Sequence, residues 1–173
     1  MNNTERRQAL RTELAAKIDR FMGSAVRRAT EVPGLTLGRR TRLEGPGCYT
    51  YEPSVALIAQ GSKRVDLGKK SFIYDESRFL LTSIDLPIAS RLLEASEEKP
   101  FLGLVLRLEL PVVRDLLSRE EIDVRETPSD GPAMATGENT PDLRTPAKTT
   151  CSSRLSSWAT SLWTAAAVFF PAA

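Results

Sequence analysis

Apolar residues recur at helical spacing near the beginning of the chain. Leu10, Leu14 and Ile18 follow one another at intervals of four, with polar residues between them. This spacing predicts an amphipathic helix over residues 4–22 that ends at Gly23, a residue type that commonly terminates helices. We interpret its apolar stripe as packing against the rest of the domain; a helix reserved for a partner protein is the alternative.

Between residues 33 and 108 the pattern changes to short apolar segments separated by turn residues. In one of them, Val65 and Leu67 alternate with Arg64 and Asp66, as in a strand with one buried face. Such segments recur at roughly eight to twelve residues, which predicts an antiparallel sandwich or barrel and argues against a parallel, Rossmann-type sheet. We expect strands at 35–37, 54–59, 63–67, 70–74, 78–82, 88–94 and 101–108, with a loop at 44–53.

The pattern changes again after residue 108. Pro111 suits the first turn of a helix, and the apolar residues at helical spacing after it predict a short helix over 111–119. We interpret residues 127–143 as a linker. Residues 135–173 contain only 5 of the 24 basic and 22 acidic residues and show no helical or strand period, so we expect a disordered tail over 144–173.

The composition excludes several classes of chemistry. The chain has no histidine, which removes histidine-ligated metal sites and catalytic triads, and Cys48 and Cys151 match no metal or redox spacing. We therefore expect no enzymatic activity, no metal site and no cofactor. The net charge of +2 is too small for general binding to polyanions. We interpret the basic cluster Arg39, Arg40 and Arg42 as a solvated strand face, with contact to a phosphate or an acidic ligand as the alternative.

Neither targeting nor membrane insertion is expected. The first residues are polar and charged, without the apolar run and cleavage pattern of a secretory signal. The longest apolar stretch, residues 165–170, is six residues long, whereas about 20 are needed to cross a bilayer. We therefore expect a cytoplasmic protein.

A series of short motifs lies between residues 52 and 88. They are Glu52-Pro53-Ser54, Gln60-Gly61 followed by Lys63 and Val65, Leu67-Gly68, Tyr74-Asp75, and Asp85-Leu86-Pro87. This series resembles the N-terminal domain found in one group of bacterial AraC-type transcriptional regulators. The resemblance extends from about residue 9 to Leu143.

The resemblance implies a cupin-like antiparallel β-barrel, a mainly β (α+β) fold with an N-terminal and a C-terminal helix. It also implies a sensor and dimerisation domain over residues 1–126, which in the family precedes two helix-turn-helix units that bind DNA. No such pattern follows Leu143, so we expect no specific DNA binding by this chain alone. A frameshift near codon 143 or 144 would produce the aperiodic tail; a natural tail is the alternative.

The resemblance also implies the partners. We expect an unknown small-molecule effector, and either a homodimer or a heterodimer with an intact regulator. Two other functions remain as alternatives: a stand-alone interaction protein that pairs with an intact regulator and titrates it, or a nonfunctional fragment. A third, a cupin enzyme, is disfavoured because such enzymes usually hold their metal with histidines.

The effector is expected inside the barrel. Tyr51, Gln60 and Tyr74 are the preferred polar contacts, because each offers one polar group in an apolar wall. Core packing is the alternative for every apolar candidate. Alternation predicts that Val55, Leu57, Val65, Leu67, Phe72, Tyr74, Phe79 and Leu81 point inward, and of these we select Leu57, Val65 and Phe72 as apolar ligand contacts.

The remaining motif residues are expected to shape turns. Gly61 and Gly68 suit turns that need a positive φ, and Asp75 suits a turn in which its side chain binds the backbone. Glu52, Pro53, Asp85 and Pro87 complete the motif residues.

Overall fold

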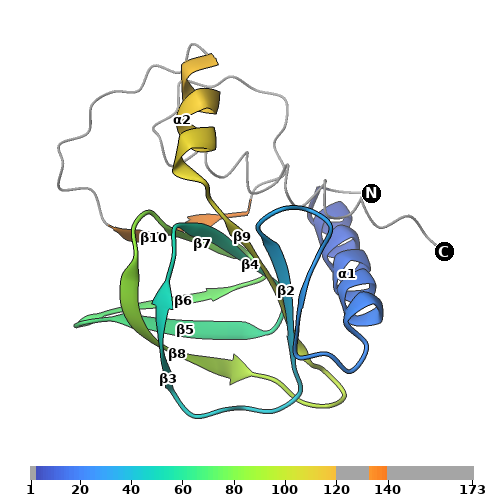
Figure 1. Ribbon diagram of the computed structural model, residues 1–173. Helices are drawn as coiled ribbons and strands as arrows, with labels where there is room; N and C mark the ends of the chain where they lie inside the picture. Colours follow the sequence, from blue (N-terminus) through green and yellow to red (C-terminus); the bar gives the residue numbers. More distant parts are fainter. Residues whose placement is uncertain (1–2, 120–132, 140–173) are drawn as a thin grey trace.

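Two antiparallel sheets face each other in this computed structural model, which describes residues 3–119 and 133–139 (Figure 1). Within those residues, one sheet has six strands in the order β1 (Arg27–Ala29), β2 (Leu35–Arg40), β9 (Phe101–Arg107), β4 (Ser54–Gln60), β7 (Arg78–Thr82) and β10 (Met134–Glu138). The other has four, in the order β3 (Gly47–Tyr51), β8 (Leu86–Glu94), β5 (Ser62–Leu67) and β6 (Lys70–Asp75). The helices are α1 (Asn3–Met22) and α2 (Leu110–Arg119). The expected mainly β, antiparallel fold class is confirmed.

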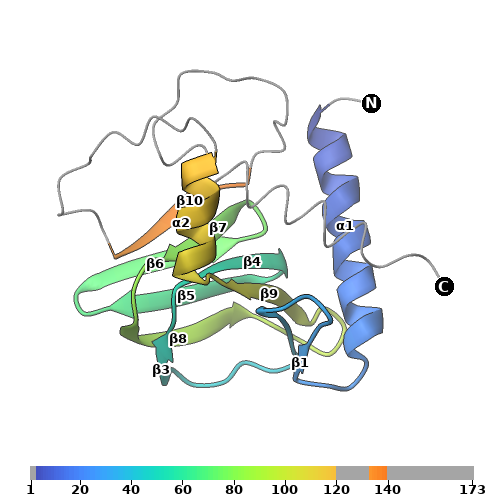
Figure 2. The same cartoon turned by 45° about the horizontal axis from the view of Figure 1, so that its top comes forward.

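The helix α1 lies along the outer face of the six-stranded sheet (Figure 2). Its apolar stripe is fully buried, with Leu14, Ile18 and Met22 each 0% exposed. Gly23 ends the helix with a φ of 53°, and its N–H donates to the carbonyl of Asp19 at 3.0 Å. The expected packing of this helix against the domain is therefore confirmed.

The strand β4 of the six-stranded sheet is buried on both of its faces. Residues packed between this sheet and α1 form what we call the outer core, which contains Leu37, Leu57 and Phe79. Residues packed between the two sheets form the inner core, which contains Ile58 and Leu80. Neighbouring residues of β4 and of β7 thus enter different cores.

This double burial corrects part of the inward-facing prediction. Val65, Leu67, Phe72 and Tyr74 belong to or pack against the inner core, as expected. The other four residues face α1 instead: Val55, Leu57, Phe79 and Leu81. In the continuous apolar run of β4 both alternating sets are apolar, so periodicity does not distinguish the face covered by a helix from the face covered by a sheet.

Three strands lie where no strand was expected. The short β1 pairs with β2, and its three residues are exposed. β3 occupies the predicted loop at 44–53, where it pairs with β8, and its side chains are mostly exposed, which removes the apolar signal. β10 lies inside the predicted linker at 127–143, where it pairs with β7 and buries Met134 to 1% exposure. The boundary expected at residue 126 and the tail expected at 144–173 lie outside the described residues.

The turn predictions are confirmed at three positions. Gly61 and Gly68 have φ values of 95° and 57°, in the region that favours glycine. The carboxylate of Asp75 accepts hydrogen bonds from the Ser77 N–H at 2.8 Å and the Ser77 hydroxyl at 2.6 Å. Burial raises the pKa of Asp75, but these hydrogen bonds and the charges of Arg11 and Arg78 together outweigh it, so the net pKa is lowered.

Candidate ligand-binding site

A cavity of about 670 Å³ lies at the inner faces of the two sheets, and we call it the inner cavity. Its six-stranded wall includes Thr36, Gly38, Ala56, Gly103 and Val105, which occupy paired positions on β2, β9 and β4. Small residues dominate this wall. A Cβ placed on Gly38 would meet no heavy atom within 4 Å, so the space in front of β2 is open. The cavity volume falls in the range of roughly 300–1,000 Å³ that is typical of small-molecule sites.

Three polar side chains meet on the opposite wall. Lys63 of β5 lies directly beside Tyr74 of β6 in the strand pairing, and both line the inner cavity with Tyr51 of β3. The half-buried Lys63 Nζ donates a hydrogen bond to the Tyr51 hydroxyl at 2.7 Å. We call Lys63, Tyr51 and Tyr74 the donor cluster.

Tyr74 is the most buried member of the donor cluster, with 3% of its surface exposed. Burial, and to a smaller extent the neighbouring Tyr51, raises the pKa of the Tyr74 hydroxyl well above its usual value. The phenol therefore keeps its proton at neutral pH and can donate a hydrogen bond into the cavity.

Charged pairs also line the inner cavity. Glu44 lies 3.8 Å from Arg40, and Glu52 lies 3.8 Å from Arg107, which leads from β9 toward α2. Both glutamates are largely exposed, so these pairs belong to the solvated part of the cavity. Within the described residues, no carboxylate lies within 4.0 Å of Lys63 Nζ.

The structure places only part of the residues expected to contact a ligand at the inner cavity. Tyr51 and Tyr74 line it, whereas Val65 and Phe72 pack in the inner core and are not among its lining residues. Leu57 borders the cavity, but its side chain belongs to the outer core.

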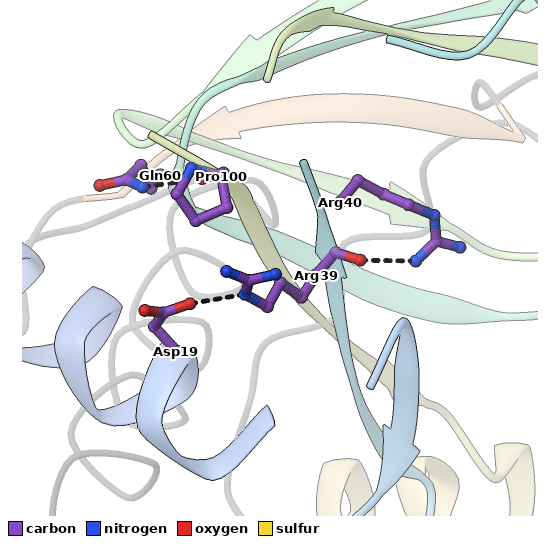
Figure 3. A network of polar contacts seen from close by, with 5 residues as sticks. All are labelled: Asp19, Arg39, Arg40, Gln60 and Pro100. Carbon is purple, nitrogen blue, oxygen red and sulfur yellow. Dashed lines mark hydrogen bonds and ion pairs between the residues drawn. The ribbon is translucent and has the colours of Figure 1, made fainter. Parts of the chain in front are cut away.

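Gln60 does not line the inner cavity. Its amide donates to the Pro100 carbonyl at 2.7 Å (Figure 3). The residue lines a separate hollow of about 530 Å³, shared with α1, that neither Tyr51 nor Tyr74 borders.

Lys63 is the functional candidate that the strand pattern did not single out. It has the same parity in β5 as Val65 and Leu67, both of which face inward. That shared parity was available in the sequence, but a lysine at the end of a strand usually reaches solvent instead.

The remaining motif residues help to position the chain around the inner cavity and do not belong to the donor cluster. The Pro53 carbonyl accepts a hydrogen bond from the Leu108 N–H at 2.8 Å, which fixes the chain between β9 and α2. Pro87 pairs with Thr50 across β3 and β8, and Asp85 is exposed where it borders the cavity.

The basic cluster of β2 is engaged by contacts within the chain. Arg39 Nε donates to the Asp19 carboxylate at 2.7 Å and ties α1 to the sheet (Figure 3). Arg40 donates to the carbonyls of Val26 and Arg39, and Arg42 lies 3.3 Å from Glu97. These contacts agree with the interpretation of the cluster as a strand face.

Within residues 3–119 and 133–139, no three His, Cys, Asp or Glu side chains gather closely enough to hold a metal ion. Neither α1 nor α2 is long and apolar enough to cross a membrane.

Comparison with protein families gives one match. The family described as AraC-type transcriptional regulator N-terminus matches residues 31–151. The match begins after α1 and extends past Leu143, where the motif resemblance was expected to end. No curated protein sequence matches the chain.

Several solved structures align with part of this chain at low sequence identity. Apo ToxT from Vibrio cholerae, in a form with one lysine-to-alanine substitution, is 10% identical with a TM-score of 0.49 and covers 84% of this chain and 51% of its own. ToxT with bound unsaturated fatty acid is 14% identical with a TM-score of 0.38, covering 53% and 34%. A cupin-2 domain protein from Shewanella frigidimarina is 8% identical with a TM-score of 0.32, covering 47% and 79%. The chain spans about half or less of the length of the ToxT chains.

Proposed function

This chain belongs to the family of AraC-type transcriptional regulator N-terminal domains, and on that premise we propose that it senses a small-molecule effector in the inner cavity. The observation that carries the proposal is the open volume of about 670 Å³ between two otherwise packed sheets. This volume lies in the range that is typical of small-molecule sites, which supports a binding role.

The walls of the inner cavity fit binding better than catalysis. Ala56, Ile58 and Val105 offer apolar surface, and the donor cluster offers a few directed polar groups. The chain has no histidine to exchange protons near neutral pH. We therefore propose a binding domain without enzymatic activity.

The position of β9 offers a route from the effector to the rest of a regulator. Gly103 and Val105 of β9 line the cavity, and α2 begins three residues after β9 ends. An effector that binds more tightly to one arrangement of β9 would favour the position of α2 that goes with that arrangement. The difference between its two affinities sets how far the equilibrium shifts. DNA binding by a whole regulator would be the output of this shift.

We also propose self-association, with a second copy of the chain or an intact relative as the partner. Leu110 and Val112 of α2 are 43% and 53% exposed, which is unusual for apolar residues of a short helix. Sedimentation velocity of the full chain measures this part of the proposal directly.

A cavity-filling variant tests the sensing function. Gly38→Phe places a ring in the open space in front of β2, where a side chain meets no backbone obstacle. The full chain is titrated with phenylnaphthylamine, an uncharged dye that fluoresces in apolar sites. We expect saturable binding to the wild type and at least tenfold weaker binding to Gly38→Phe.

The matched control is Glu31→Phe, which adds the same ring on the exposed turn before β2. It should leave dye binding unchanged. Equal binding to the wild type and a folded Gly38→Phe variant, or no saturable binding at all, would refute the inner cavity as the effector site.

A further inference from the structure

The donor cluster has more hydrogen-bond donors than acceptors. An ammonium group carries three N–H donors, and only one of those on Lys63 is used by the Tyr51 hydroxyl. The Tyr51 oxygen accepts that bond and still has its own hydrogen to donate. The Tyr74 hydroxyl makes no hydrogen bond to any residue in the described ranges 3–119 and 133–139.

The charge of the donor cluster is also unbalanced. The glutamates that line the inner cavity lie beside Arg40 and Arg107, and no described carboxylate approaches Lys63 within 4.0 Å. Besides its hydrogen bond to Tyr51, the Lys63 Nζ lies over the ring of the same tyrosine, 5.4 Å from the centroid. A negatively charged ligand group would supply both the missing acceptor atoms and the missing charge.

From this imbalance we propose that the effector is an organic anion whose acidic group is bound by Lys63, Tyr51 and Tyr74. This inference rests on the proposed function and adds the chemical class of the ligand. The rest of the cavity limits the class further. Ala56, Ile58 and Val105 provide one apolar wall, which fits a hydrocarbon or aromatic body, and Thr36, Ser54 and Ser90 add hydroxyl groups to the lining.

Two dyes of the same shape separate the acidic group from the apolar body. Anilinonaphthalene sulfonate is an anion, and phenylnaphthylamine is the same scaffold without the sulfonate. Both are titrated into the full chain, with Gly38→Phe as the check that each binds in the inner cavity. We expect the wild type to bind the sulfonate dye about tenfold more tightly than the uncharged dye.

Lys63→Met removes the charge while keeping an unbranched side chain of similar length. We expect the preference for the sulfonate dye to disappear, with the affinity for the uncharged dye changed less than twofold. Tyr51→Phe keeps the ammonium and removes one donor, and we expect about a threefold loss for the sulfonate dye alone. Lys69→Met, in the exposed turn between β5 and β6, is the matched control and should change neither affinity.

The outcomes distinguish the two proposals. Equal affinity for both dyes in the wild type, or a preference that survives Lys63→Met, overturns the anion site while binding in the cavity stands. A Lys63→Met variant that loses both dyes equally also overturns it, because the lysine would then only support the fold. If Gly38→Phe displaces neither dye, the proposed function fails and the anion site fails with it.

Discussion

Replacing Leu57 by alanine is expected to lower the stability of the fold without weakening ligand binding. Leu57 is 1% exposed and packs in the outer core with Leu14 and Ile18 of α1. Truncating a buried leucine to alanine typically costs about 2–5 kcal/mol, depending on how far the surroundings relax. The Asp19–Arg39 ion pair holds α1 in place in addition to packing. The helix therefore cannot move freely to fill the space that the Leu57 side chain leaves.

We therefore expect a loss of about 3 kcal/mol in the free energy of unfolding, from the middle of that range. For a chain of this length, each kcal/mol lowers Tm by roughly 2–4 °C, so Tm should fall by about 9 °C. Urea denaturation followed by circular dichroism measures the free energy. Phenylnaphthylamine titration of the folded variant measures the cavity.

Gly38→Phe provides the opposite pattern, with dye binding lost and stability largely kept, because the ring enters open space. Together the two variants show which face of the six-stranded sheet packs against α1 and which face binds the dye. If Leu57→Ala weakened dye binding at least tenfold and changed the free energy of unfolding by less than about 0.5 kcal/mol, a magnitude usual for surface sites, the placement of Leu57 against α1 would be refuted.

Two further predictions concern turns and self-association. Gly61→Ala should cost about 2 kcal/mol, since a Cβ there would lie 3.0 Å from the Glu94 carbonyl oxygen at a φ of 95°. Gly68→Ala should cost about 1 kcal/mol, because a Cβ there meets no neighbour and only the φ of 57° is unfavourable. Equal losses of unfolding free energy for the two variants in urea denaturation would contradict this account. Val112→Asp should convert a dimer to a monomer in sedimentation velocity, and a wild type that is already monomeric would exclude self-association through α2.

The elements that could be predicted from the sequence are those with strong local signals. The four-residue spacing of Leu10, Leu14 and Ile18 predicts α1, and the structure buries Leu14 and Ile18 fully and Leu10 partly against the sheet. Pro111 predicts the start of α2 within one residue. Gly61 and Gly68 predict two turns, because few other residues adopt a positive φ without strain.

The elements that could not be predicted depend on tertiary pairing. β3 has mostly exposed side chains and exists because it pairs with β8. β10 carries Gly137, a poor strand former, opposite Phe79 of β7, where a Cβ would overlap the ring. In both strands the hydrogen-bonding partner outweighs weak local propensity.

Only part of the candidate site could be predicted, because the rest of it also depends on tertiary contacts. Tyr51 and Tyr74 were chosen as polar groups in an apolar wall, and both line the inner cavity. Leu57 was assigned to the wrong side of β4, because α1 covers a face that alternation alone does not distinguish from the inner one. Gln60 follows a register shift after Ile58 in the pairing of β4 with β9, and it lines the hollow beside α1. The role of Lys63 depends on the hydroxyl of Tyr51, which comes from a strand that the sequence did not predict.

Isoleucine methyl NMR of the full chain during phenylnaphthylamine titration tests the central claim most directly. Ile58 lines the inner cavity, Ile18 lies in the outer core, and Ile73 is 55% exposed on β6. We predict that the Ile58 methyl signal shifts with the dye while the Ile18 and Ile73 signals stay in place. Shifts centred on Ile18 or Ile73, with Ile58 unchanged, would contradict an effector site between the two sheets.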